Sequence, residues 1–387
     1  MSARALSHLR VAEIGSGVSA AYTAKLLADL GADVIKIESP QGDVTRTVGP
    51  FPGGHVDRET SGLFLYLNAN KRGVVLDLEA SGDRARLDRL LDRVDVVVHD
   101  VPPVKLAAYG LEPDAVLRNR PRLVATSISP FGLSGPYRDY KAYDLNLWNA
   151  GGVACLNGAG PGSDDLAPLR TFGHQAMFQA GLNAAVATLG AIYSRELSGA
   201  GQHVEVSTQE CLVTILELTY PFWSYCQLTA TRLGNKPIQP LDFFECRDGW
   251  VFLCAVEEHQ WKTFVEVMGS PEWAQLEIFG DRLQRGANWD ALKPMIAEWM
   301  SGQTVQEIYA LLQRRRVPIA PVSTMGDLWA SKHLQARGFF VSFRHPRAGT
   351  LRMPGAPYVF SRTPWQLSRP APLLGQHTAE VLAEAGA

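Results

Sequence analysis

The sequence predicts an α/β protein with a doubly wound parallel sheet and a smaller second domain. Over residues 9–129, strand-like segments rich in Val and Ile alternate with helical patterns. A glycine-rich turn follows the first of these strands. Residues 232–325 differ in character, with more tryptophan and isolated short strands. The length of 387 residues fits two domains at about 150 residues each.

The strands of the predicted sheet are short β-branched runs. Residues 32–37 (ADVIKI) have the nearly continuous apolar character of a parallel strand that is buried on both faces. Helices predicted at residues 20–30 and 81–93 connect such strands, and this order indicates βαβ units. The predicted strands are residues 9–14, 32–37, 73–78, 95–99, 123–129 and 203–207.

A long amphipathic helix is predicted over residues 174–196. Its apolar residues, among them Met177, Leu182 and Val186, recur at three- and four-residue steps. Residues 198–201 (SGAG) end the helix, since glycine is typical of helix C-termini.

The predicted domain organisation has four segments. We expect residues 1–210 to form the N-terminal part of a large domain, 211–231 a linker, 232–325 the small domain, and 326–387 a segment returning to the large domain. This last segment is proline-rich, and proline fixes φ and removes a backbone donor, so we expect it to lie extended across another part. The small domain is expected to hold strands near 243–246 and 250–256, with helices near 259–268 and 304–315.

Charge and composition argue against several classes of partner. The 37 Lys and Arg side chains nearly balance 39 Asp and Glu, so no global field attracts nucleic acid or an anionic membrane. The five cysteines include no C-x-x-C pair, which disfavours a disulfide framework and a Cys-rich zinc site. No apolar run approaches the roughly 18 residues of a membrane span. We therefore expect a cytoplasmic protein with no metal and no nucleic-acid or membrane partner.

The turn after the first strand, residues 15–20 (GSGVSA), fits the pattern G-x-G-x-x-A, and Glu38 ends the second strand about twenty residues later. This pattern would suit the pyrophosphate and ribose of a nicotinamide dinucleotide. The alternative is that small residues let strand, turn and helix pack closely. The absence of a third glycine favours that alternative.

Other polar residues are candidates for chemistry. Imidazole at a helix N-terminus tends to stay neutral, so His174 could act as a base, although a first-turn histidine is also a common packing group. Asp144 is an acid expected near the same place, with helix capping as its alternative role. Glu257 follows a strand of the small domain, where a solvated loop is the commoner outcome. Basic residues near turns of the sheet are candidates for a phosphate-rich ligand, namely Lys36, Arg46, Lys71, Arg72, Lys105, Arg138 and Lys141.

Motifs along the whole chain resemble the family III CoA-transferases, the CaiB/BaiF group that includes formyl-CoA transferase and the α-methylacyl-CoA racemases. In the N-terminal half the similar segments are residues 28–38 (ADLGADVIKIE), 70–72 (NKR), 143–144 (YD) and 199–202 (GAGQ). In the C-terminal half they are residues 232–235 (RLGN), 317–322 (VPIAPV), 336–338 (ARG) and 371–378 (APLLGQHT).

This resemblance implies a Rossmann-like large domain, a smaller inserted α+β domain and two subunits interlocked like links. It also implies that coenzyme A, as an acyl-CoA substrate, lies across the large domain, with the thioester in a cleft at the subunit interface. The residues then expected near CoA are Val18, Lys36, Arg46, Asn70, Lys71, Arg72, His99 and Lys141.

The resemblance also exposes a departure at the catalytic position. In the transferases an aspartate at the start of the long helix attacks the acyl-CoA to form a mixed anhydride. Here the matching pair is Gly173-His174, and imidazole cannot form a carboxylic anhydride. The racemases have a histidine directly before the aspartate that corresponds to Asp144, and this chain has Tyr143 at that histidine position. Racemisation is therefore disfavoured, although Glu257 matches an acidic position of the racemases.

Three hypotheses follow. In the first, the chain is one subunit of a heteromeric CoA-transferase, paired with a paralogue that carries the catalytic Asp, as in family members that act on benzylsuccinate. In the second, it is a stand-alone CoA-ester lyase or hydratase, as a homodimer, with His174 as base. In the third, residues 15–20 make it an NAD(P)-dependent oxidoreductase. In the first and second hypotheses the substrate is an acyl-CoA, and in the first a carboxylic acid is the second substrate.

Overall fold

The computed structural model describes residues 4–158, 166–217, 219–230 and 238–386. The chain forms two compact units, the first made of residues 1–233 with 338–387 and the second of residues 234–337. The predicted boundary between residues 231 and 232 lies outside the described residues.

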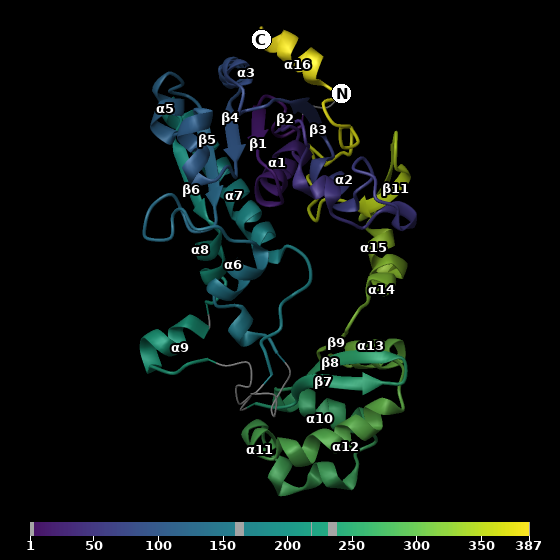
Figure 1. The fold of residues 1–387 in the computed structure, drawn as a ribbon. Coiled ribbons are helices and arrows are strands. Elements are labelled where there is room, and N and C mark those ends of the chain that lie inside the picture. Colours follow the sequence, from purple (N-terminus) through teal and green to yellow (C-terminus); the bar gives the residue numbers. More distant parts are fainter. Residues whose placement is uncertain (1–3, 159–165, 218, 231–237, 387) are drawn as a thin grey trace. The chain divides into compact units, whose positions relative to one another are not determined.

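The first unit is built on a six-stranded parallel sheet, which confirms the α/β fold class (Figure 1). The strand order is β3-β2-β1-β4-β5-β6, so successive strands first move outward from β1 in one direction and then in the other. In such sheets ligands bind beyond the carboxyl ends of the strands where the direction reverses, here between β1 and β4. The strands are β1 (Arg10–Ile14), β2 (Asp33–Glu38), β3 (Lys71–Val75), β4 (Val96–His99), β5 (Val124–Ser129) and β6 (His203–Ser207).

Helices cover both faces of this sheet. On one face, α1 (Ser19–Asp29) and α7 (Gln175–Ser198) pack together over a core that includes Val11, Val98 and Val124. The other face is covered by α3 (Ser81–Leu91), α4 (Leu106–Tyr109), α5 (Pro113–Arg118) and α16 (Thr378–Ala385). The strands are buried on both sides, which is why their sequences read as continuous apolar runs.

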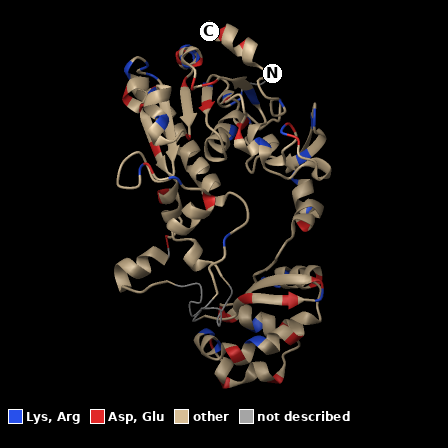
Figure 2. Cartoon of the chain, viewed as in Figure 1, with Lys and Arg blue, Asp and Glu red and all other residues tan. Residues whose placement is uncertain are grey.

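Helix α7 is apolar because it is a core helix. Nine of its residues are buried, most of them alanine, glycine or threonine, so its backbone approaches that of α1 closely. Figure 2 shows it tan along nearly its whole length, since only Arg195 and Glu196 among its 24 residues carry charge. By length and composition alone α7 could cross a membrane, contrary to the expectation from sequence, although 44% of its most apolar stretch is buried within the protein.

Further elements complete the first unit. They are α2 (Gly62–Asn68), α6 (Asp144–Ala150), α8 (Thr208–Val213), α9 (Thr219–Cys226), the hairpin β10 (Phe340–His345) and β11 (Gly349–Pro354), and short 3₁₀ turns that include η1 (Val44–Thr47). The segment predicted as a linker, residues 211–231, thus contains the end of α8 and all of α9.

The C-terminal segment closes the outer edge of the sheet at β3. The Gly73 amide donates to His377 Nδ1 (3.1 Å), the His377 amide to the Gly73 carbonyl (2.9 Å), and the Val75 amide to Thr378 Oγ1 (3.0 Å). Helix α16 then packs beside α3 (Figure 1). Two backbone donors of the edge strand are therefore satisfied by residues about 300 positions later.

The second unit is a small α+β fold. The antiparallel sheet β7-β8-β9 places Phe244, Val251 and Leu253 in a core shared with the surrounding helices. This unit runs to residue 337, beyond the expected boundary at 325. Its elements are β7 (Leu241–Cys246), β8 (Gly249–Cys254), β9 (Ile319–Pro321), α10 (Glu258–Val267), α11 (Arg282–Ala287), α12 (Trp289–Ser301), α13 (Val305–Arg314), α14 (Met325–Ala330) and α15 (Lys332–Ala336).

Candidate active site

The glycine turn after β1 is occupied by the protein's own carboxylates. The Ser16 amide donates to Asp100 Oδ1 (3.1 Å), and the Gly17 amide donates to Asp43 Oδ2 (3.4 Å). A Cβ at Gly15 would lie 2.0 Å from Asp100 Oδ1, so glycine is needed there for close approach. A dinucleotide pyrophosphate at this turn would meet two carboxylates in place of free amides, so this geometry does not favour the nicotinamide hypothesis.

Asp100 follows β4 and lies beside the reversal point of the sheet. Burial and the neighbouring Asp43 raise its pKa to about 6, well above the ordinary value for an aspartate. The carboxylate is therefore held in a setting that disfavours its charged form.

Lys36 and Lys71 form an internal ion-pair network with Glu13. Lys36 Nζ lies 2.7 Å from Glu13 Oε1 and 2.7 Å from Asp43 Oδ2. Lys71 Nζ lies 2.6 Å from the other oxygen of Glu13 and 2.9 Å from Asn68 Oδ1. Burial lowers the pKa of Lys71 to about 8, whereas for Lys36 three carboxylates, of Asp43, Glu13 and Glu38, outweigh burial and raise the pKa. Both lysine side chains are fully buried, and their ammonium groups are paired with carboxylates within the protein.

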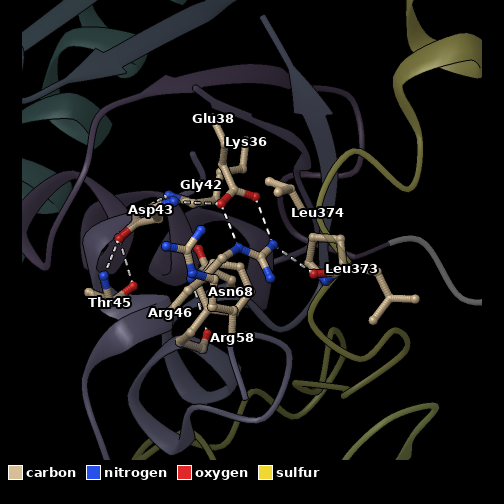
Figure 3. Close-up of polar contacts among 12 residues, drawn as sticks. Lys36, Glu38, Gly42, Asp43, Thr45, Arg46, Arg58, Asn68, Leu373 and Leu374 are labelled. Atoms are coloured by element: carbon tan, nitrogen blue, oxygen red, sulfur yellow. Dashed lines mark hydrogen bonds and ion pairs between the residues drawn. The ribbon is translucent and has the colours of Figure 1, made fainter. Parts of the chain in front are cut away.

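Arg46, in η1, is also fully buried and is held by carboxylates (Figure 3). Its Nε and Nη2 donate to the two oxygens of Glu38 at 2.7 and 2.8 Å, and Nη1 donates to Glu59 Oε2 at 2.8 Å. Nη2 also donates to the Pro372 carbonyl (3.1 Å), and the guanidinium stacks 3.7 Å from the Phe64 ring centroid. Arg46 thus joins the β2–η1 connection to the C-terminal segment.

Asn70 and Arg72 anchor the same segment. Asn70, with φ of 67°, accepts at Oδ1 from the Ser368 amide (2.9 Å). Arg72 pairs with Asp33 (2.7 Å), Glu380 (3.0 Å) and Glu384 (2.8 Å). Their contacts are internal to the unit.

His99 is buried at the carboxyl end of β4. Its Nε2 lies 2.9 Å from Ser127 Oγ, which lies 2.9 Å from His203 Nε2. Burial lowers the pKa of His99 to about 3, so the imidazole is neutral.

The structure therefore divides the residues expected near CoA. Only Lys141, on the loop between β5 and α6, is exposed. The buried ones are Val18, Lys36, Arg46, Asn70, Lys71, Arg72 and His99. Their geometry supports a structural role, and direct contact with CoA stays a prediction. The burial of Lys36 had a signal in the sequence, since this lysine lies inside an apolar β-branched run.

The start of α7 brings His174 and Asp144 together. His174 is the N-cap residue, follows Gly173 with φ of 90°, and makes no side-chain capping bond. Asp144, the first residue of α6, accepts at Oδ1 from the Met177 amide (3.1 Å). Burial raises the pKa of Asp144, and the α7 amides and His174 partly oppose that effect. Tyr143 beside it is 74% exposed. An imidazole and a carboxylate thus share one helix terminus.

Glu257 belongs to the second unit, where it is the N-cap residue of α10. It forms a capping box with Gln260 and lies 3.5 Å from Arg282. Among the described residues, no group of three or more His, Cys, Asp or Glu side chains is arranged to hold a metal ion.

Comparisons with known proteins identify relatives over nearly the whole chain. A model of CoA-transferase family III matches residues 6–378. The succinyl-CoA:(R)-benzylsuccinate CoA-transferase subunit BbsE of Thauera aromatica is 33% identical over 391 residues, which cover 98% of this chain and 94% of the relative. A succinyl-CoA:mesaconate CoA-transferase of Haloarcula hispanica is 32% identical over 397 residues, covering 99% and 96%. The crystal structure of a CaiB/BaiF family protein from Brucella suis superposes with a TM-score of 0.89 at 28% identity, covering 99% of each chain.

Proposed function

The chain belongs to CoA-transferase family III, and from this premise we propose that it is one subunit of a heteromeric enzyme that moves CoA from an acyl-CoA to a carboxylic acid. The observation that carries the proposal is His174 at the N-cap of α7, the position where the resemblance expects the attacking aspartate. The enzyme's nucleophilic carboxylate then comes from a paralogous chain.

The chemistry explains why a second chain is required. An aspartate attacks the thioester carbonyl, CoA leaves as thiolate, and a mixed anhydride forms. The thiolate then attacks the aspartyl carbonyl, which releases the donor acid as a carboxylate and leaves an enzyme thioester. The acceptor carboxylate attacks this thioester and expels the thiolate, and the thiolate finally takes the acceptor acyl group and frees the aspartate. An acylated imidazole has no carboxyl carbon of its own, so it cannot hold CoA as a thioester. Several relatives are named as subunits, including BbsE at 33% identity and the succinyl-CoA–L-malate CoA-transferase beta subunit of Chloroflexus aurantiacus at 29%.

Exposed apolar side chains support an interlocked assembly. On α7 a stripe with helical spacing, Leu182, Val186, Tyr193 and Leu197, is 46–73% exposed. On α9, Tyr220, Phe222, Trp223 and Tyr225 are 43–86% exposed, and none of the residues of this helix is buried. Large apolar side chains that are exposed together on one helix are typical of protein interfaces. Within this proposal the exposed Lys141 contacts a CoA phosphate, and the five free thiols suit a reducing cytoplasm.

The test is reconstitution with trapping. We expect the isolated chain to transfer no CoA, and the chain co-purified with a paralogue that has Gly-Asp at this position to be active. Hydroxylamine traps the acyl or CoA adduct of a carboxylate, so the modified aspartate is expected on the partner. His174→Asp should move part of the adduct to this chain, whereas His259→Asp, at an exposed position of α10 in the second unit, should not. CoA transfer by the isolated wild-type chain would refute the proposal.

A second candidate, a lyase or hydratase, is favoured by the proximity of His174 and Asp144 at one helix terminus. In that reaction His174 removes a proton next to the thioester carbonyl. The isolated chain should then add or remove water from an acyl-CoA, and His174→Ala should abolish this turnover. Turnover that survives the substitution would exclude His174 as the base.

A further inference from the structure

We propose that Asp144 is a positioning residue that holds the first turn of α7, and with it His174, from the neighbouring helix α6. The inference rests on the second candidate function, the lyase or hydratase, in which His174 at the start of α7 acts as the base. It assigns Asp144 a role through backbone amides and not through contact with substrate.

The first turn of a helix has amides without acceptors inside the helix, and these need partners. The N-cap residue usually supplies one, but His174 makes no such bond. Asp144 Oδ1 takes over this role from another helix, accepting from the Met177 amide at 3.1 Å. The carboxylate that caps α7 therefore comes from α6, whereas His174 lies at the N-cap of α7 itself.

The charge of Asp144 is tied to the same place. Its side chain is half-buried, which disfavours the anion, while the amides of Met177 and Ala176 and the charges of His174 and Arg170 favour it. A negative charge near a helix N-terminus is also favoured by the helix dipole. The site thus keeps one carboxylate at the start of α7 although residue 174 is not acidic.

This arrangement links α6 to catalysis. Without the carboxylate, the Met177 amide loses its acceptor, and the turn that begins at Gly173, with φ of 90°, is no longer tied to α6. A displacement of about 1 Å at a reacting group can cost on the order of a hundredfold in rate. The loss therefore appears in turnover more than in substrate binding.

The experiment measures the addition or removal of water from an acyl-CoA by the isolated chain. Asp144→Ala should lower kcat by about 10- to 100-fold with KM nearly unchanged, and Asp144→Asn, which keeps an acceptor oxygen, should restore most of it. The matched control is Asp139→Ala on the same loop, an exposed carboxylate paired with Arg138, and it should leave kcat unchanged. An Asn variant no better than Ala would overturn the inference.

Hydrogen exchange of the isolated chain separates this inference from the second candidate function. The Met177 amide should exchange faster in Asp144→Ala but not in Asp144→Asn or Asp139→Ala. If the isolated chain turns over no acyl-CoA while this protection is lost, the second candidate function fails and the positioning role stands. If Asp144→Ala leaves the protection unchanged, the positioning role fails whatever the enzyme does.

Discussion

Replacing Arg46 by methionine tests whether this arginine is structural or a ligand for CoA. The substitution keeps much of the side-chain volume beside Phe64 but removes three charge-assisted bonds to Glu38 and Glu59. Glu38, which is 2% exposed, would keep only the Asp43 amide as a partner among the bonds described here. Breaking one side of a buried ion pair costs about 3–5 kcal/mol, because a charge is left buried without compensation.

The assay is urea unfolding of the CoA-free chain, followed by far-UV circular dichroism. The slope of the unfolding free energy against urea increases with chain length, and at about 3 kcal/mol per molar the expected loss moves the midpoint by roughly 1–2 M. The double variant Arg46→Met, Glu38→Gln should lose less than the two single variants combined, because the unpaired charge is gone. Arg138→Met, which breaks an exposed pair with Asp139, should cost less than about 1 kcal/mol.

A different result would refute the structural interpretation of Arg46. If the free energy of unfolding of Arg46→Met stayed within about 1 kcal/mol of the wild-type value, the buried pairs would contribute little to stability. If the same variant also bound CoA more weakly, the arginine would be a ligand. Isothermal titration with CoA measures that binding independently of stability.

Two further predictions concern the carboxylate of Asp100 and the space around two glycines, Gly201 and Gly190. The pKa of Asp100 is about 6 in the folded chain, above its ordinary value, so its charged form costs stability at neutral pH and this cost disappears as the pH falls through 6 towards 4. Asp100→Asn should therefore raise the free energy of unfolding by about 1–3 kcal/mol at pH 8 and by much less at pH 4, and a gain that did not depend on pH would contradict this reasoning. A Cβ at Gly201 would lie 2.0 Å from the Leu123 carbonyl oxygen, so Gly201→Ala should destabilise the chain by about 2 kcal/mol or more. Gly190→Ala, with nothing within 4 Å, should raise the stability of the isolated chain by about 0.5–1 kcal/mol, and equal effects of the two substitutions in thermal unfolding would disprove the steric argument.

The large sheet could be predicted from sequence because its strands have a local signal. Buried parallel strands are β-branched runs, and β2 and β5 begin and end within one residue of their predicted bounds. Helix α9 had no such signal, since its aromatic residues are exposed and show no buried face. The hairpin β10–β11 was also not predicted, because the proline-rich composition around it suggested extended chain.

The candidate site was harder to predict because charge alone does not reveal burial. Lys36, Lys71 and Arg46 look like phosphate ligands in sequence, yet each is matched by carboxylates that only the folded chain brings close. The partner of Asn70 lies 298 positions away at Ser368, and no local pattern encodes such a pair. The expected proximity of Asp144 to the start of the long helix is present, and the catalytic roles of both residues stay predictions.

The closure of β3 by residues near 377 also bears on how the chain is made. Until the ribosome has added those residues, the Gly73 and Val75 amides face outward from an unfinished sheet. An open strand of this kind is a template for pairing with another nascent copy. The second unit is translated within that interval, so any delay there prolongs the time during which the growing polypeptide is prone to aggregation.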